Sequence, residues 1–316
     1  MKQFVSNSMT VCCLLATLTL SLCSFVSQAK TPRLVGVTVV DLGNPFFGAI
    51  THNIEQQVAA SMPGAKTLVV SGDYDLGKQS TQFDNFIQAG ADIIIVSAID
   101  SQAISAAVRR ARAAGIVVVA IDNTADGAQA TVTTNNVLAG QQSCAYLAQR
   151  LKGKGNMLII NGPQVSGVKD RVKGCEEALK PYPDIHILSD NQNGVGTRDG
   201  GLNVATGLLT AHDNVNAIFT INDPSAIGAD LAARQLQRQG ILIATVDGSP
   251  DIEDALKNPT SIVASSAQRP AELAKVAVQT ALQLFNQSAP AQPNQMVSPQ
   301  LVTRDNISSY QGWKSQ

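Results

Sequence analysis

Residues 92–122 read DIIIVSAIDSQAISAAVRRARAAGIVVVAID, and this stretch decides the fold. Two aliphatic runs, 93–96 and 116–121, flank a segment in which apolar residues recur at helical spacing among arginines and serines. Neither run alternates with polar residues, so neither strand would have a polar face for water. Strands of this kind are typical of a parallel sheet that helices cover on both faces. The stretch therefore predicts a strand, a helix and a second strand parallel to the first.

The same alternation extends outward over the chain. Earlier apolar runs stand at 33–40 and 67–70, and the latter is also expected to lack a polar face. A second series of strands, at 156–162, 185–190, 216–223 and 242–248, alternates with helical patterns. We predict an α/β fold with two doubly wound parallel-sheet lobes. The expected lobes are residues 30–134 plus 269–298 and residues 135–268 plus 299–316, joined by three hinge crossings near Thr134, Gln268 and Pro299.

Length and charge limit the class of protein. A chain of 316 residues exceeds the usual size of one hydrophobic core, which favours two lobes. The 23 Lys and Arg residues nearly balance 24 Asp and Glu residues, and neither sign gathers in a block. A basic stripe that neutralises phosphates is therefore missing from the sequence, and we expect no nucleic-acid partner.

Residues 1–29 have the pattern of a secretory signal peptide. Lys2 precedes an uncharged apolar run, and small residues at Ser27 and Ala29 follow it, so we expect cleavage after Ala29. The run is shorter than the ~20 residues of a membrane-spanning helix, which disfavours an anchor. Lipidation at Cys23 is an alternative. An exported chain would work in the periplasm.

Two cysteines remain after the signal segment, Cys144 and Cys175. They fall on two successive helical patterns, and an oxidising compartment favours a disulfide between them. Two buried free thiols are the alternative. Neither a C-x-x-C spacing nor a nearby histidine accompanies them, so we expect no zinc or redox chemistry.

Polar residues end several of the predicted strands. Asn44 follows the first strand, Asp122 and Asn123 follow 116–121, and Asn222 and Asp247 end strands of the second series. Ligands of open parallel sheets bind beyond the carboxyl ends of the strands, so a cleft between two lobes would collect these side chains around one small polar molecule. Each Asp or Asn also suits a helix N-cap.

Seven short motifs carry a resemblance that spans nearly the whole chain after the signal segment. In chain order they are NPFF at 44–47, AID at 120–122, TTNNVLAG at 133–140, DRVKG at 170–174, INDPSAIGA at 221–229, VDGSPD at 246–251 and AQRP at 267–270. Their order resembles the periplasmic sugar-binding proteins of the ribose-binding type, which deliver monosaccharides to ABC importers. The resemblance implies hinge closure on one sugar.

The resemblance also implies a role for each site residue. Phe46 and Phe47 would lie against the apolar faces of a sugar ring, although both also suit a hydrophobic core. The polar contacts would come from Asn44, Ser97, Asp122, Asn123, Arg171, Asn222, Asp247 and Gln268. Two positions depart from the family: Asn123 replaces an arginine, and Gly196 stands where an aromatic residue is usual. A hexose, a pentitol or another polyol is therefore as plausible a ligand as ribose.

Other classes of protein lack their signatures in this sequence. No G-x-G-x-x-G follows the first strand, no G-x-S-x-G or Walker loop occurs, and His52, His186 and His212 do not have metal-ligand spacing. We expect no enzymatic activity, cofactor or metal. Sugar-responsive repressors share the fold, but the first strand begins too early for a DNA-binding headpiece. The expected partners of a monomeric binding protein are a sugar or polyol and an importer permease; an exported sensor for a chemoreceptor or sensor kinase is the alternative.

Overall fold

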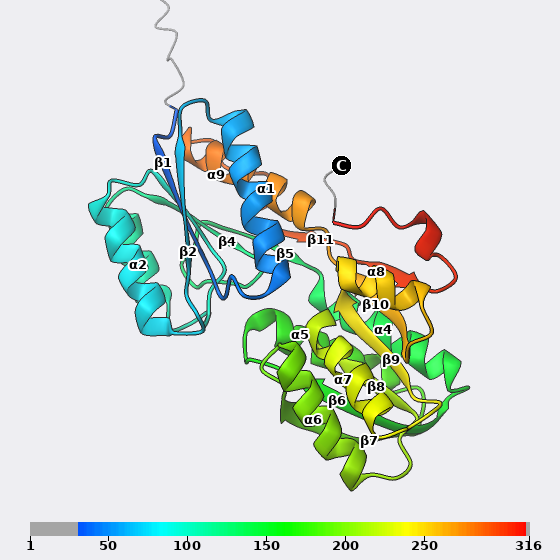
Figure 1. The fold of residues 1–316 in the computed structure, drawn as a ribbon. Coiled ribbons are helices and arrows are strands. Elements are labelled where there is room, and N and C mark those ends of the chain that lie inside the picture. Colours follow the sequence, from blue (N-terminus) through cyan, green and yellow to red (C-terminus); the bar gives the residue numbers. More distant parts are fainter. Residues whose placement is uncertain (1–30, 314–316) are drawn as a thin grey trace, which may run out of the picture. The chain divides into compact units, whose positions relative to one another are not determined.

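The computed structural model describes residues 31–313. The predicted signal peptide and Cys23 lie outside the described residues. The described chain builds two six-stranded sheets, and we call the half around each sheet the first and the second lobe (Figure 1). The first sheet has the order β11 (Asn294–Val297), β5 (Ala130–Thr134), β4 (Val117–Ile121), β3 (Ile93–Val96), β1 (Leu34–Val39), β2 (Lys66–Ser71). The second has the order β12 (Gln300–Thr303), β10 (Ile262–Ala267), β9 (Leu242–Asp247), β8 (Ala217–Thr220), β6 (Lys154–Asn161), β7 (Asp184–Asn193).

Helices cover both faces of the first sheet. Alternate strand residues point to opposite faces, so Ile93 and Ile95 share one hydrophobic cluster while Ile94 and Val96 belong to another. The first cluster packs under α1 (Pro45–Ser61) and α9 (Pro270–Phe285), and the second under α2 (Leu76–Gln88) and α3 (Ser105–Ala113). The stretch 92–122 thus forms the predicted parallel β3–α3–β4 unit.

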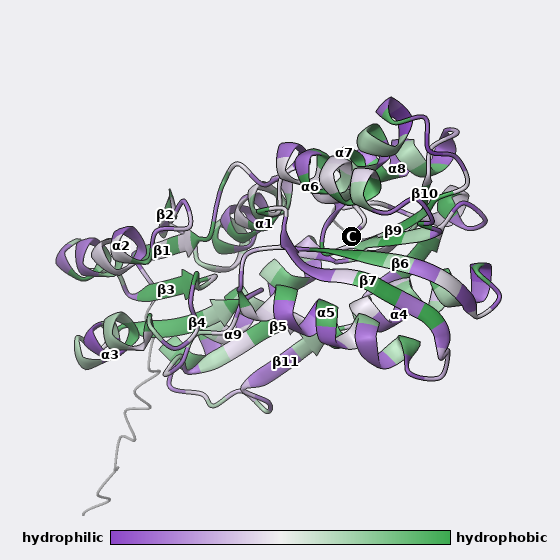
Figure 2. Ribbon diagram, turned by 90° about the horizontal axis from the view of Figure 1, so that it is seen from below, coloured by the Kyte–Doolittle hydropathy of each residue, from purple (hydrophilic) through white to green (hydrophobic). Residues whose placement is uncertain are grey.

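The second sheet is covered in the same way. One face packs against α4 (Asn136–Arg150) and α5 (Ser166–Leu179), and the other against α6 (Arg198–Ala211), α7 (Asp223–Gln235) and α8 (Pro250–Lys257). A short 3₁₀ helix, η1 (Ile307–Ser309), follows β12. In Figure 2 the central strands of both sheets are hydrophobic, while the helices carry both hydrophobic and hydrophilic residues. The predicted doubly wound α/β fold is confirmed.

Helices α4 and α5 approach each other closely. A Cβ on Gly140 would lie 1.9 Å from the carbonyl oxygen of Arg171, and a Cβ on Gly174 would lie 2.0 Å from that of Val137. A disulfide joins Cys144 of α4 to Cys175 of α5, with 5.0 Å between the Cα atoms. The close approach holds α5, and with it the side chain of Arg171, against the second sheet.

The structure corrects two details of the predicted sheets. Residues 67–70 were expected to be fully buried, but β2 is an edge strand, and Leu68 is 43% exposed. An edge strand lacks a neighbour on one side, which leaves part of it in water. The sheets are also not wholly parallel, since β12 pairs antiparallel with β10. The chain crosses between lobes after β5, after β10 and between β11 and β12.

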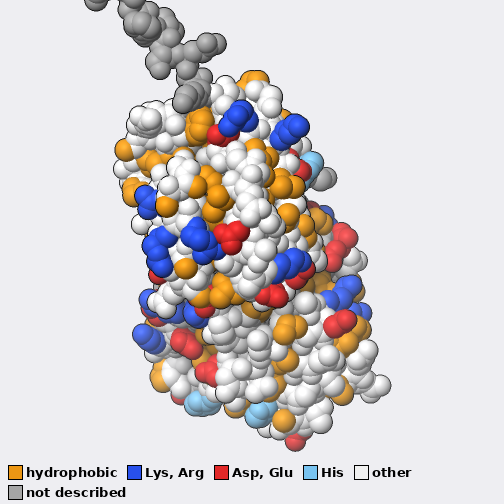
Figure 3. Space-filling view, turned by 90° about the vertical axis from the view of Figure 1, so that its left-hand side faces the viewer, with side chains coloured by type: hydrophobic (Ala, Val, Ile, Leu, Met, Phe, Trp, Pro, Cys, Tyr) orange, Lys and Arg blue, Asp and Glu red, His pale blue; other side chains and the backbone are white. Residues whose placement is uncertain are grey.

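The surface carries charges of both signs. On the face seen in Figure 3, Lys and Arg side chains lie beside Asp and Glu side chains over both lobes. Within residues 31–313, no helix is long and apolar enough to span a bilayer.

Candidate functional site

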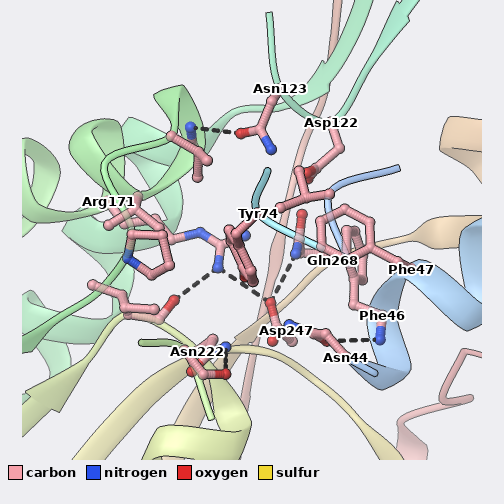
Figure 4. Close-up of a pocket in the computed structure, with 17 residues that line it drawn as sticks. Asn44, Phe46, Phe47, Tyr74, Asp122, Asn123, Arg171, Asn222, Asp247 and Gln268 are labelled. Carbon is pink, nitrogen blue, oxygen red and sulfur yellow. Dashed lines mark hydrogen bonds and ion pairs between the residues drawn. The ribbon is translucent and has the colours of Figure 1, made fainter. Parts of the chain in front are cut away.

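A pocket lies between the carboxyl ends of the two sheets, where ligands of open parallel sheets bind. Figure 4 shows Phe46 and Phe47 on one side of it, Arg171 on the opposite side, and Asp247 and Gln268 between them. Nine of the ten residues predicted to bind a ligand are in the lining: Asn44, Phe46, Phe47, Asp122, Asn123, Arg171, Asn222, Asp247 and Gln268.

The aromatic wall comes from the first turn of α1. Pro45 occupies the first helical position, and the Asn44 side chain caps the helix by accepting a hydrogen bond from the backbone N–H of Phe46. The rings of Phe46 and Phe47 meet edge to face at 5.7 Å. Both side chains are also buried in the core of the first lobe. The core interpretation therefore holds for both residues, which also line the pocket, while their contact with a sugar ring stays a prediction.

A buried ion pair forms the charged centre of the pocket. Arg171 Nη1 lies 3.2 Å from Asp247 Oδ1, and the two side chains are 7% and 3% exposed. Arg171 also donates to the carbonyl oxygen of Ile221 at 2.7 Å and, through Nε, to Asn136 Oδ1 at 2.9 Å. These contacts hold the guanidinium in one orientation at the edge of the pocket.

Gln268 connects the ion pair to the crossings between the lobes. Its Nε2 donates to Asp247 Oδ1 at 2.8 Å, and its Oε1 accepts from Thr134 Oγ1 at 2.7 Å. Thr134 ends β5 and Gln268 follows β10, so each stands where the chain passes from one lobe to the other. Hydrogen bonds through Gln268 thus connect Thr134 to the Asp247 carboxylate.

Asp122 is the acidic group on the first-lobe side. Burial raises its pKa to about 6, while the positive charge of Arg171 acts in the opposite direction and the negative charge of Asp247 adds to the rise. Ser97 is not among the residues that line the pocket. Its hydroxyl donates a hydrogen bond to Asp122 Oδ2 at 3.3 Å. Burial also raises the pKa of Asp247, against the effect of Arg171. Asp122 and Asp247 have φ of 63° and 133°, a strained backbone that is common at functional sites.

Asn123 makes contacts that the sequence did not suggest. Its Oδ1 accepts hydrogen bonds from Gly167 N at 3.1 Å and Ser166 Oγ at 3.3 Å, both in the second lobe. The Ser166 hydroxyl accepts from the backbone N–H of Thr124 at 3.0 Å. Asn123 Nδ2 donates to Ser97 Oγ at 3.2 Å within the first lobe. The residue therefore joins the lobes at the pocket edge.

Tyr74 lines the pocket and was missed by the sequence analysis. It lies in the loop after β2, so the rule that selected the other strand-end residues also applies to it. Its hydroxyl is 3.8 Å from where a Cβ on Gly196 would stand. The Tyr74 side chain thus lies next to Gly196, where a larger residue at position 196 would place its own side chain. Burial raises the pKa of Tyr74 to about 12, and the carboxylates of Asp41, Asp122 and Asp247 add to the effect.

Asn222 caps a helix, as was considered for it, and also lines the pocket. Its Oδ1 accepts from the backbone N–H of Ser225 at 3.2 Å and caps α7, while its Nδ2 donates to the carbonyl oxygen of Gly196 at 2.8 Å. Gly196 lies in a turn with φ of 70°, a conformation that favours glycine. Capping thus fixes the amide of Asn222 at the pocket edge.

The pocket offers hydrogen-bond donors and acceptors around an aromatic wall. Among the described residues, no group of three or more His, Cys, Asp or Glu side chains is placed to hold a metal ion. The arrangement suits a neutral molecule that has hydroxyl groups along its edge and apolar C–H faces.

Comparison with known proteins identifies relatives of the whole described fold. The family profile described as "periplasmic binding protein domain" matches residues 35–288. A ribose import binding protein of Bacillus subtilis is 31% identical, with 81% of this chain and 82% of the relative aligned. A xylitol-binding protein of Mycolicibacterium smegmatis is also 31% identical, covering 81% of this chain and 73% of that protein.

A solved structure extends the comparison. The periplasmic solute binding protein of an ABC transporter from Actinobacillus succinogenes, with bound D-allose, superimposes with a TM-score of 0.81 at 27% identity. The alignment covers 88% of this chain and 100% of that one.

Proposed function

This chain belongs to the periplasmic binding protein family, among the sugar-binding proteins of ABC importers, and on that premise we propose that it captures a monosaccharide or polyol in the pocket between its lobes. The observation that carries the proposal is the lining, in which an aromatic wall faces a ring of charged and amide side chains. The relatives are binding proteins, and we assign this chain no enzymatic activity.

The residue types match the chemistry of a sugar. A pyranose has apolar C–H faces and hydroxyl groups around its edge, so the Phe46 and Phe47 rings would contact a face. Asp122 and Asp247 would accept hydrogen bonds from hydroxyl groups, and Arg171 would donate to an oxygen. Hydrogen bonds to charged groups contribute about 1.5–3 kcal/mol each. A few of them, with ring contact, reach the ~8 kcal/mol of a micromolar dissociation constant after the ordering cost is subtracted.

We propose that binding is coupled to closure of the lobes. The polar side chains come from both lobes, so a ligand held by Asp122 and Arg171 together has a higher affinity for the closed arrangement and shifts the population toward it. The Thr134–Gln268–Asp247 hydrogen bonds support this coupling because they connect two crossings to the site. The closed, loaded monomer would then deliver its ligand to an importer permease from the periplasm. No relative named above supports the sensor alternative, which stays a prediction.

A ligand screen tests the proposal. Thermal shift with D-ribose, D-allose, xylitol and myo-inositol, followed by calorimetry, should find at least one compound that raises the melting temperature, since a ligand of the folded form stabilises it. Asp247→Ala should weaken that binding at least about tenfold, the loss of one charge-assisted hydrogen bond. Asp251→Ala, which alters an exposed carboxylate nearby, is the matched control. The absence of binding across pentoses, hexoses and polyols would refute the proposal.

A further inference from the structure

The C-terminal tail contacts both lobes behind the pocket. After η1 the tail, red in Figure 1, turns back from the second lobe toward the first. The ring of Trp313 meets the ring of Phe46 edge to face, with 5.8 Å between centroids. Its indole Nε1 donates to the backbone carbonyl oxygen of Asp247 at 2.8 Å. Trp313 does not line the pocket, but it touches one pocket residue from each lobe.

A second side chain of the tail supports the same loop. The hydroxyl of Tyr310 donates to the carbonyl oxygen of Gly248 at 2.7 Å. A Cβ on Gly248 would lie 2.4 Å from that hydroxyl, so the residue after Asp247 must lack a side chain for Tyr310 to approach. The backbone carbonyl groups of Asp247 and Gly248 thus each accept a hydrogen bond from a side chain of the tail.

The backbone at this point needs such support. Asp247 has φ of 133°, and a non-glycine residue in this region is strained. Strained conformations persist only where the surrounding contacts determine them. The direction of the Asp247 carboxylate, which faces Arg171 and Gln268, depends on this backbone.

We infer that Trp313 is a positioning residue of the pocket, which holds the Asp247 backbone of the second lobe against the Phe46 ring of the first. The inference rests on the proposed function for its effect on affinity, but the contacts themselves are testable without a ligand. A substitution at Trp313 should therefore alter the ligand affinity of the pocket, although Trp313 does not line it.

The first test removes the indole donor and keeps a ring. Trp313→Phe should weaken binding of the tightest compound among D-ribose, D-allose, xylitol and myo-inositol about threefold to tenfold, the value of one neutral hydrogen bond. Gln311→Ala changes an exposed tail residue and is the control, with an affinity equal to that of the wild type. Equal affinities for Trp313→Phe and the wild type, measured by calorimetry, overturn the inference.

A double-mutant cycle separates positioning from a general structural role. If Trp313 acts through Asp247, the effect of Trp313→Phe on affinity should shrink to less than about twofold in an Asp247→Ala background. The same fold-change in both backgrounds would show that Trp313 acts elsewhere, and the inference would fail.

The third test needs no sugar, because Trp313 is the single tryptophan of the chain. Its fluorescence in the ligand-free protein should resist quenching by acrylamide, and Phe46→Ala should make it easier to quench. An indole as accessible as free tryptophan would overturn the inference whatever the ligand screen shows. Conversely, a shielded indole in a protein that binds no sugar would refute the proposed function alone.

Discussion

The carboxamide oxygen of Asn123 accepts a hydrogen bond from the backbone N–H of Gly167, 3.1 Å away in the other lobe. Gly167 belongs to the first turn of α5, whose N-cap residue, Val165, makes no side-chain cap. The first N–H groups of a helix have no partner within the helix, so a residue of the first lobe satisfies a donor of the second. Separation of the lobes would remove this cap.

Asn123→Ala should therefore weaken ligand binding. A lost helix cap costs about 1 kcal/mol. If the cap forms only when the lobes meet, this cost opposes closure and lowers affinity about fivefold. Calorimetry measures the change, with the exposed Asn191→Ala as control. An unchanged dissociation constant would show that the cap does not contribute to closure.

Arg171→Met should strongly destabilise the fold. It leaves the Asp247 carboxylate buried without its charged partner, and breaking a buried pair costs about 3–5 kcal/mol. Urea unfolding measures the free energy of unfolding. Arg110→Met is the control, because Arg110 and its partner Asp84 are each 45% exposed and such a surface pair contributes about 0–1 kcal/mol. Similar losses in the two variants would contradict this account.

The acid Asp122 should give stability a specific pH dependence. Its pKa is raised from 3.8 to about 6 by burial, so the folded protein holds this proton more tightly than the unfolded chain. The contribution of Asp122 to the free energy of unfolding therefore falls as pH rises from about 4 to 6, by about 3 kcal/mol at most. Asp122→Asn removes this contribution.

Unfolding curves of Asp122→Asn and wild type, measured from pH 4 to 8, check the effect. The free energy of unfolding of the variant, relative to that of the wild type, should rise between about pH 4 and 6 and stay constant above pH 6. Asp126→Asn, at an exposed position nearby, is the control. A constant difference between Asp122→Asn and wild type over the whole range would contradict the raised pKa.

Loss of the Cys144–Cys175 disulfide should destabilise the protein. The bond closes a loop with a sequence separation of 31, which corresponds to about 3–4 kcal/mol in the chain-entropy account. The double variant Cys144→Ala/Cys175→Ala should unfold at lower urea, and a reductant should affect only the wild type. Two titratable thiols in denatured, unreduced wild-type protein would show that the bond does not form.

Much of the fold was predictable because buried parallel strands have a simple signature. The runs at 93–96 and 116–121 could only be covered on both faces, and β3 and β4 are so covered. The edge position of β2 was not predictable, since residues 67–70 show no alternation of polar and apolar residues that would mark a face in water. The order of strands in a sheet depends on contacts among all of its strands, so the sequence of one strand does not determine its position.

The site was predictable where its residues end strands and less so elsewhere. Asp122, Asn222 and Asp247 follow strands and meet in the pocket, although their contacts with a ligand stay a prediction. Asn123 also lines the pocket, and its expected contact with a ligand stays a prediction. Its hydrogen bond to Gly167 in the other lobe joins positions far apart in sequence, which the sequence does not reveal. Trp313 gave no signal, because nothing local relates a tail to Phe46 and Asp247.

The adjacent strands β11 and β12 supply an edge to each sheet from residues 294–303. Neither lobe is therefore encoded by one uninterrupted stretch of the gene. A ribosome must translate β11 before the first sheet can gain its last strand, and β12 before the second sheet can do so. A nascent chain that stops before residue 294 would carry two unfinished halves instead of one completed domain.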